Sequence, residues 1–292
     1  MPERKGVNVP KGATVHQGHK PKLGQHFLTS APAAQRIIDA LGDLSEATVL
    51  EIGPGRGALT SLLAPAVRRL IAVELDRVLA AQLRMKFAPR PNVEIIEGDF
   101  LKIELDTVFG PKPGSLRPGL NFAPQPARVV GNLPYYITSD ILLRLLEYHR
   151  YFSTIVVMVQ KEVADRLAAS PGSRDYGLLS ATTQLFARVE KRFTLPPAAF
   201  SPPPKVHSSV VRMTIEPRAA ELQVREDEFV SFLKLSFGQK RKTLWNNLKT
   251  QYDENRLRAA LAQAGVKPAV RAEALPLAQS AALFRALRNG TG

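Results

Sequence analysis

Apolar runs and helical spacings alternate along the first two thirds of the chain. The runs at residues 49–52, 70–76 and 93–99 predict short buried strands, because a strand covered on both faces carries apolar side chains at successive positions. Apolar residues with helical spacing occur before the first run, at 32–41, and after the second, at 78–87. This alternation predicts a parallel, doubly wound α/β sheet.

The same alternation continues toward the C-terminus and then stops. Residues 128–131 and 154–159 predict two more strands, and residues 189–194 and 206–215 predict a final antiparallel pair. Beyond them only amphipathic helical patterns remain, so we place a domain boundary near residue 218. The predicted helices of this half are residues 139–148, 161–168, 178–186, 226–237, 256–264 and 279–287.

Two segments lack any periodic pattern. Residues 1–20 are polar, basic and rich in glycine, and we expect a flexible arm there. Residues 110–126 are rich in proline and glycine, which predicts an unusually long loop for such a sheet. The predicted organisation is therefore an arm of residues 1–20, an α/β domain of residues 21–217 and a helical domain of residues 218–292.

Composition and charge narrow the class of protein. The 292 residues suffice for about two domains, and the hydrophobic fraction of 45% fits a soluble globular chain. The formal net charge of +14 favours a polyanionic partner such as nucleic acid, since Lys and Arg neutralise phosphates. A basic surface without such a partner is the simpler alternative.

Several chemistries are excluded by what the sequence lacks. There is no cysteine, which rules out disulfides, thiolate metal sites and a cysteine nucleophile. The five histidines are scattered without metal-ligand spacing, so no metal is expected. No apolar run approaches the ~18 residues of a membrane span, and the first residues lack the apolar core of a signal peptide. We therefore expect a cytoplasmic protein.

A glycine-rich turn follows the first predicted strand. Gly53, Gly55 and Gly57 stand between residues 49–52 and a helical pattern that begins near Leu59. Glycine lets the backbone adopt positive φ and approach a ligand closely, and a helix N-terminus offers free N–H groups. The segment predicts a cradle for a nucleotide-like ligand. Close packing of strand and helix is the alternative explanation of the glycines.

Carboxylates end the next two predicted strands. Glu74 lies about 20 residues after the glycine turn, where a carboxylate accepts hydrogen bonds from both hydroxyls of a ribose. Asp99 is suited to the exocyclic amine of adenine, which offers two N–H donors. Either acid alone is equally explained as a solvated strand end. Together with the glycine turn they favour S-adenosylmethionine over a dinucleotide.

The segment Asn132-Leu-Pro-Tyr135 points to a specific reaction. An adenine N6 amine is a poor nucleophile, because its lone pair is delocalised into the ring. Acceptors on its two hydrogens favour a tetrahedral nitrogen, and we expect them from the Asn132 side-chain oxygen and the backbone carbonyl of Leu133 or Pro134. Tyr135 offers a face on which a flipped base stacks, worth ~1–3 kcal/mol. An Asn-Pro turn with a packed tyrosine is the alternative, and Tyr136 is expected to pack.

Further motifs accompany these residues. The full set is Gly24-Gln-His-Phe-Leu28, Glu51-Ile-Gly-Pro-Gly-Arg-Gly57, Val73-Glu74, Gly98-Asp99, Gly131-Asn-Leu-Pro-Tyr-Tyr136, Gln160-Lys-Glu162, Phe200-Ser-Pro-Pro-Pro-Lys-Val206 and Arg241-Lys-Thr-Leu-Trp-Asn-Asn-Leu248. Together they resemble the ribosomal RNA adenine N6,N6-dimethyltransferase family, from about residue 20 to the C-terminus. The resemblance implies a Rossmann-like class I methyltransferase sheet with a small all-helical C-terminal domain.

The resemblance also implies a role for each matched residue. Asn132 would contact the cofactor and the target amine, with Tyr135 on one side of the target adenine and Phe200 on the other; a core aromatic is the alternative for Phe200. His26 stands where many family members have Asn, so a backbone contact is expected there more than a side-chain contact. The contacts implied for S-adenosyl-L-methionine are His26, Leu28, Gly53, Glu74, Asp99 and Asn132.

A basic cluster lies in the predicted helical domain. We interpret it as a grip on the RNA backbone, with a solvated basic turn as the alternative. The resemblance implies that this domain helps to dock the protein on the small ribosomal subunit. The cluster consists of Lys234, Lys240, Arg241 and Lys242.

The residues and the resemblance together imply a methyltransferase that dimethylates N6 of two adjacent adenosines near the 3′ end of 16S, or small-subunit, ribosomal RNA, with a monomer as the default expectation. One alternative is an enzyme of the macrolide-resistance type, which methylates an adenine of large-subunit RNA. Another is a ribosome-assembly factor on the same fold that no longer depends on catalysis. A nicotinamide oxidoreductase is disfavoured by the Asn-Leu-Pro-Tyr segment and by the charge.

Overall fold

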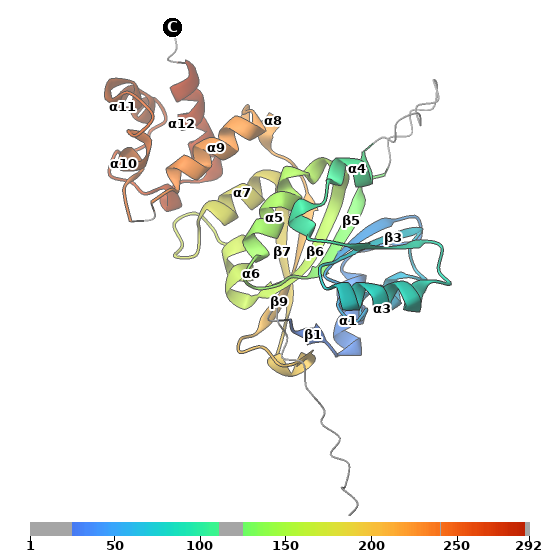
Figure 1. Ribbon diagram of the computed structural model, residues 1–292. Helices are drawn as coiled ribbons and strands as arrows, with labels where there is room; N and C mark the ends of the chain where they lie inside the picture. Colours follow the sequence, from blue (N-terminus) through green and yellow to red (C-terminus); the bar gives the residue numbers. More distant parts are fainter. Residues whose placement is uncertain (1–24, 111–124, 240, 290–292) are drawn as a thin grey trace, which may run out of the picture.

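The computed structural model describes residues 25–110, 125–239 and 241–289 (Figure 1). Its centre is a seven-stranded sheet with the strand order β4-β3-β2-β5-β6-β9-β7. The first five strands of that order are parallel, and β9 is antiparallel to both of its neighbours. These strands are β2 Thr48–Ile52, β3 Arg69–Glu74, β4 Val93–Glu97, β5 Ala127–Asn132, β6 Phe152–Gln160, β7 Ala187–Leu195 and β9 Ser208–Ile215. The predicted doubly wound sheet and the predicted antiparallel pair are both confirmed.

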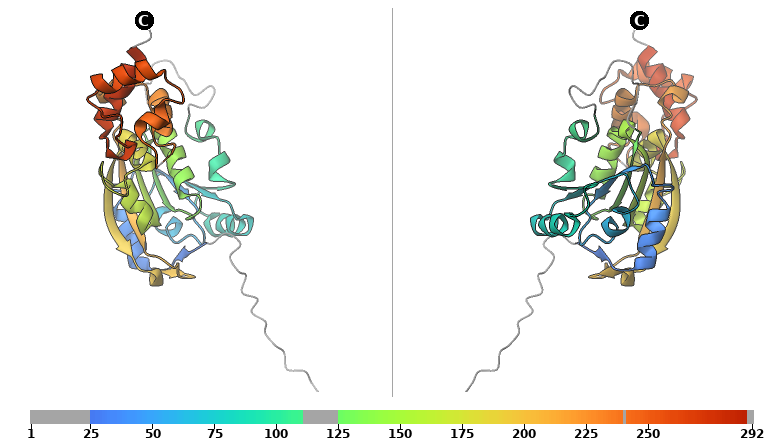
Figure 2. Two further views of the ribbon diagram at one scale, coloured as in Figure 1. Left: turned by 90° about the vertical axis from the view of Figure 1, so that its left-hand side faces the viewer. Right: turned by 90° about the vertical axis from the view of Figure 1, so that its right-hand side faces the viewer.

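Helices cover both faces of the sheet, as the two side views show (Figure 2). Successive strand residues contribute to opposite cores, so that Val49 packs with one helical layer and Leu50 with the other. This double burial explains the continuous apolar runs of the strands. The first layer consists of α1 Ala31–Asp39, α2 Thr60–Leu63 and α3 Arg77–Phe87, and the second of α5 Thr138–Glu147, α6 Lys161–Leu167 and α7 Leu178–Phe186.

The C-terminal part is helical and gathers at one end of the molecule (Figure 1). Its apolar side chains join the second core, since Phe229 and Leu283 belong to the same buried cluster as Leu142 of α5. The secondary structure changes from strand to helix between Ile215 and Ala219, beside the boundary predicted near residue 218. The helices are α8 Ala219–Leu222, α9 Glu226–Ser236, α10 Leu244–Leu248, α11 Glu254–Gln263 and α12 Leu277–Asn289.

A second, two-stranded sheet lies outside the main one and was not predicted. Its strands are β1 Phe27–Leu28 and β8 Phe200–Ser201, paired antiparallel. The backbone amide and hydroxyl of Thr29 both donate to the Ala199 carbonyl, at 2.9 and 3.1 Å, and extend the pairing. The pairing brings the N-terminal segment across the carboxyl ends of the central strands.

The remaining short elements connect these layers. They are η1 Phe100–Lys102, α4 Leu105–Phe109, η2 His149–Tyr151, η3 Pro197–Ala199 and η4 Ala272–Ala274. The predicted arm of residues 1–20 and most of the predicted loop 110–126 lie outside the described residues. Within the described ranges, no helix is long and apolar enough to cross a membrane.

The strand order places a topological switch point between β2 and β5. The chain leaves β2 toward the helices of one face and leaves β5 toward those of the other, which opens a crevice at their carboxyl ends. Ile52 of β2 is opposite Val73 of β3 and also opposite Gly131 of β5. Glu74 and Asn132, one residue further along each neighbour, therefore reach the crevice at the same level.

Gly131 should tolerate no side chain, because a Cβ atom there would lie 2.8 Å from the Ile52 carbonyl oxygen and 3.0 Å from a Leu133 methyl group. We expect Gly131→Ser to lower the free energy of unfolding by about 1–3 kcal/mol, as overpacked cores do. Denaturant titration measures the change. The control is Gly177→Ser, where a Cβ meets nothing within 4 Å and serine suits the N-cap of α7. Equal stability of the two variants would contradict this prediction.

Candidate active site

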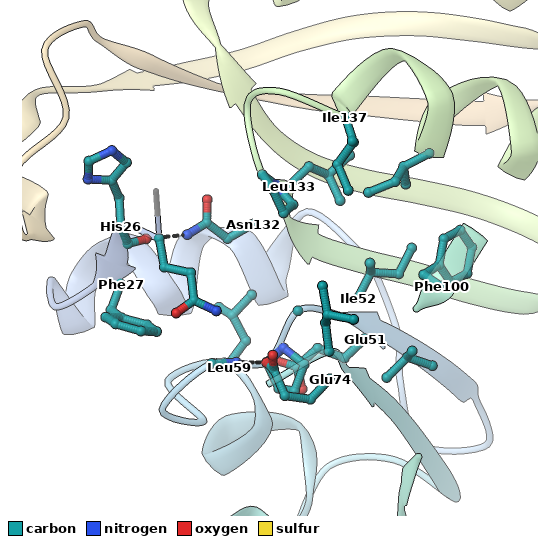
Figure 3. Close-up of a pocket in the computed structure, with 18 of the residues that line it drawn as sticks. His26, Phe27, Glu51, Ile52, Leu59, Glu74, Phe100, Asn132, Leu133 and Ile137 are labelled. Carbon is teal, nitrogen blue, oxygen red and sulfur yellow. Dashed lines mark hydrogen bonds between the residues drawn. The ribbon is translucent and has the colours of Figure 1, made fainter. Parts of the chain in front are cut away.

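A pocket opens at the carboxyl ends of the central strands, with about 1070 Å³ of empty space that includes open solvent (Figure 3). Five loops and strand ends converge on it: the segment around β1, the glycine turn, the end of β3, the end of β4 and the turn after β5. All six residues predicted to contact the cofactor line the pocket, and so do four of the five predicted catalytic residues. These lining residues are His26, Leu28, Gly53, Glu74, Asp99, Asn132, Leu133, Pro134 and Tyr135.

The glycine turn adopts the conformation that its sequence predicts. Gly53, Gly55 and Gly57 have φ values of 65°, 58° and 80°, in the left-handed region that disfavours side chains. Gly55 has a second reason to be glycine, because a Cβ atom there would lie 2.8 Å from the ring of Phe27. The turn therefore packs directly beneath β1, and the two segments together form one wall of the pocket.

Glu74 connects the end of β3 to the glycine turn. Its side chain is buried, at 2% exposure, and its two oxygens accept hydrogen bonds from the Gly55 and Asp76 amides, both at 2.9 Å. Burial raises the pKa of Glu74, and the two backbone donors partly oppose the rise. Each carboxylate oxygen keeps a further lone pair for a ligand donor.

Glu51 is a second buried carboxylate that sequence reasoning did not single out. It lines the pocket at 1% exposure, and its Oε2 has no hydrogen-bond partner among the described residues. Burial raises the pKa of Glu51 to about 7; Thr60 opposes this rise and the Glu74 carboxylate adds to it. The available signal was an acid inside an apolar strand, directly before the glycine turn. Two neighbouring buried carboxylates favour a positively charged ligand.

The Asn132 side chain is held in one orientation. Its Nδ2 donates a 2.7 Å hydrogen bond to the backbone carbonyl of His26, as the dashed line in Figure 3 shows. The amide nitrogen is thereby engaged, and Oδ1 accepts no hydrogen bond from the part of the chain that the structure describes. Asn132 can therefore offer this oxygen to a donor in the pocket.

The structure also distinguishes between the Leu133 and Pro134 carbonyls, the two candidates for the second acceptor. The Pro134 carbonyl already accepts from the Thr138 hydroxyl at 2.9 Å and from the Ile137 amide at 3.3 Å. The Leu133 carbonyl accepts no hydrogen bond from the described residues, while its own amide donates to the Met158 carbonyl at 3.1 Å. Leu133 is thus the better acceptor of the two.

Tyr135 and Tyr136 differ in their surroundings. Tyr135 is half-buried: its hydroxyl shares a 2.7 Å hydrogen bond with Ser208, and its ring lies 5.7 Å from that of His26. Burial raises its pKa. Tyr136 is 60% exposed at the pocket, so the expectation that it packs was wrong.

The structure does not bring Phe200 to the pocket. Its side chain is 4% exposed and belongs to the apolar core beneath α1, and its backbone pairs with Leu28. The pairing of β1 with β8 turns the ring into this core, which is the alternative that the sequence left open. Phe200 therefore supports the pocket wall from behind.

The basic cluster lies on the helical end of the molecule, away from the pocket. Lys234, Arg241 and Lys242 are exposed and take part in no ion pair with the described residues. Lys240 lies outside the described residues. Three exposed cations without acidic partners remain compatible with the predicted RNA grip.

A sequence model described as ribosomal RNA adenine dimethylase matches residues 16–289 of the chain. The chain belongs to this family. It is a methyltransferase, and its sheet has the class I methyltransferase fold expected from the sequence.

Named relatives agree with this assignment. The chain is 58% identical over 271 residues to "Ribosomal RNA small subunit methyltransferase A" of Koribacter versatilis strain Ellin345, which covers 93% of this chain and 95% of the relative. A crystal structure of a dimethyladenosine transferase from Plasmodium falciparum is 26% identical with a TM-score of 0.70, covering 88% of this chain and 96% of that one. The crystal structure of the 23S rRNA methyltransferase ErmE is 29% identical with a TM-score of 0.62, covering 90% and 99%.

Glu51 should make the stability of this family member depend on pH. Folding raises the pKa of Glu51 from 4.5 to about 7, so the folded protein keeps a proton that the unfolded chain releases. Stability therefore falls as the pH rises from about 4.5 to about 7. We expect Glu51→Gln to lack this loss and to be more stable above pH 7 by up to about 3 kcal/mol. Denaturant titrations from pH 4 to 8 provide the measurement.

The matched control is Glu46→Gln, which makes the same chemical change on an exposed side chain. It should leave the slope of stability against pH unchanged. A parallel response of both variants would show that Glu51 is not the group responsible.

Proposed function

We propose that this enzyme transfers methyl groups from S-adenosyl-L-methionine to N6 of two adjacent adenosines near the 3′ end of small-subunit ribosomal RNA, producing N6,N6-dimethyladenosines. The observation that carries the proposal is the fixed Asn132 side chain, whose Nδ2 is bound to His26 and whose Oδ1 remains available. Beside it, the Leu133 carbonyl provides a second available acceptor. Two acceptors match the two hydrogens of one exocyclic amine.

The residues of the pocket fit S-adenosyl-L-methionine. When bound, this cofactor supplies a methyl group activated by a sulfonium, together with an ammonium group. Glu51 and Glu74 place two buried carboxylates without a basic partner among the described residues, and positive charge in the pocket offsets the cost of burying them. Glu74 would hold the ribose hydroxyls and Asp99 the adenine amine. His26, Leu28 and Gly53 would contribute backbone contacts.

On the target side, Asn132 and Leu133 act by positioning and by charge stabilisation. Their oxygens accept hydrogen bonds from the two N6 hydrogens. These hydrogen bonds favour a tetrahedral nitrogen and disperse the positive charge that develops there. Tyr135, held by Ser208 and His26, presents its ring to the base and offsets the cost of flipping it.

The choice of the small subunit rests on the relatives. The 58% identical relative is named for small-subunit RNA, whereas the structure named for 23S RNA is only 29% identical. The net charge of +14 suits either RNA, with Lys234, Arg241 and Lys242 gripping its backbone. We place the reaction in the cytoplasm, on the small subunit or its precursor, with the enzyme acting as a monomer.

Labelled S-adenosylmethionine and separated ribosomal subunits that lack adenine dimethylation test the substrate. We expect label at two neighbouring adenosines of the small subunit, mapped by primer extension. Label confined to large-subunit RNA would instead establish the alternative function, methylation of an adenine of large-subunit RNA. Cofactor binding without label on either subunit would favour an assembly factor that does not depend on catalysis.

Asn132→Ala should lower the rate of methyl transfer by about 10²–10³-fold, because it removes an acceptor aimed at developing charge. The variant should lose only about 1 kcal/mol of stability, the worth of one hydrogen bond. Asn255→Ala, at an exposed side chain of α11, is the control and should methylate normally. Undiminished transfer by Asn132→Ala would remove this residue from the mechanism.

A further inference from the structure

Exposed apolar side chains concentrate around the mouth of the pocket. Five large ones are exposed in the described part of the chain, and three of them lie at or beside the mouth. Leu75 and Tyr136 line the pocket itself, and Val206 lines a second groove, two residues before the Ser208 that bonds to Tyr135. The other two, Val78 and Met85, lie on α3. Single exposed apolar residues are ordinary on protein surfaces, but a group at the rim of a binding pocket indicates a contact.

Tyr136 is the largest of the three, and no described residue holds its ring. It makes no hydrogen bond and no ring contact with the described residues, whereas the neighbouring Tyr135 is held by Ser208 and His26. The turn before α5 thus presents two consecutive aromatic rings at one pocket. One ring is fixed in the wall, and the other stands at the rim.

A second groove lies near this turn. The hydrogen bond between Tyr135 and Ser208 joins the turn to the first residue of β9, and Val206 stands two residues earlier, in the loop before that strand. Lys205 and His207 of the same loop also line the groove. Glu162, Asp165 and Asp175 line the groove as well, so it presents an apolar side chain together with charges of both signs.

Two exposed cations stand at this rim without acidic partners in the described ranges. Arg56 lies within the glycine turn with its guanidinium 4.6 Å from the centre of the Phe27 ring, and Lys205 lies in the groove. By contrast, Lys161 in the same groove is paired with Asp165 at 2.7 Å. An unpaired cation at the pocket and another in the groove suit the phosphates that flank a flipped nucleotide.

We propose that Tyr136 forms a second base subsite, on which the nucleotide adjoining the target adenosine stacks while the target occupies the pocket. This inference rests on the proposed function and deepens it. Flipping a base removes a stacking partner from its neighbour, and the Tyr136 ring replaces that partner. Purines stack more strongly than pyrimidines, so the subsite favours adenine. With two adjacent adenosines, one sits in the pocket and the other on Tyr136, and a shift of one nucleotide exchanges them.

A double-mutant cycle between enzyme and RNA tests the subsite. The enzyme variants are Tyr136→Ala, Tyr136→Phe, which keeps the ring, and Met85→Ala, an equally exposed apolar side chain away from the pocket. The RNA partners are undimethylated small subunits with either both adenosines or uridine in place of one. Equilibrium binding is measured without cofactor, so that affinity is separated from chemistry.

We expect Tyr136→Ala to bind the natural particle ~5- to 150-fold more weakly than the parent enzyme, the range of one base stacked on an aromatic ring. Tyr136→Phe and Met85→Ala should bind like the parent. Uridine beside the target should weaken binding of the parent but cause little further loss in Tyr136→Ala, since the two changes remove the same contact.

Strictly additive effects, or parent-like binding by Tyr136→Ala, would overturn the subsite. Methylation of the natural particle by the parent enzyme is measured in parallel. Failure of the parent to methylate would count against the proposed function, whereas normal methylation with additive binding effects would count against Tyr136 alone. Unchanged cofactor affinity of Tyr136→Ala, measured by calorimetric titration, would show that the pocket remains intact.

Discussion

The hydrogen bond from the Asn132 side chain to the His26 backbone orders the catalytic half of the pocket. An amide side chain can present either its oxygen or its nitrogen, and only the oxygen serves as an acceptor. By engaging Nδ2, the His26 carbonyl leaves Oδ1 without a hydrogen-bond donor among the described residues. That carbonyl is itself held in place by the pairing of β1 with β8 and by the two bonds from Thr29 to Ala199. The two short strands β1 and β8 thus fix the orientation of the Asn132 side chain.

The half of the pocket around Glu51 and Glu74 depends on a different constraint, the burial of two carboxyl groups. Glu51 and Glu74 lie in the interior of the fold, and both have raised pKa values because water is excluded from them. Glu74 recovers part of the cost through the Gly55 and Asp76 amides, while one oxygen of Glu51 recovers none from the described residues. Such a conflict with folding stability is expected at a functional site, and a cationic ligand would relieve it.

The periodic patterns predicted the sheet and most helices, because each such element is long enough to show its period. The strands β1 and β8 have two residues each and α10 has five, too short for any period to appear. Phe200 could not be placed, since its environment is decided by Leu28, far away in the sequence. Tyr135 and Tyr136 have nearly the same local sequence, and only tertiary contacts with Ser208 and His26 separate the fixed ring from the exposed one.

Strand register joins the two halves of the pocket. Ile52 is paired with Val73 on one side and with Gly131 on the other, so Glu74 and Asn132 leave the sheet at the same level. A slip of one residue between β2 and β5 would turn Asn132 to the opposite face and leave Glu74 where it is. Gly131 helps to exclude that slip, because only a residue without Cβ lets the Ile52 carbonyl approach this closely. The relative position of Glu74 and Asn132 is therefore set by backbone pairing in the core.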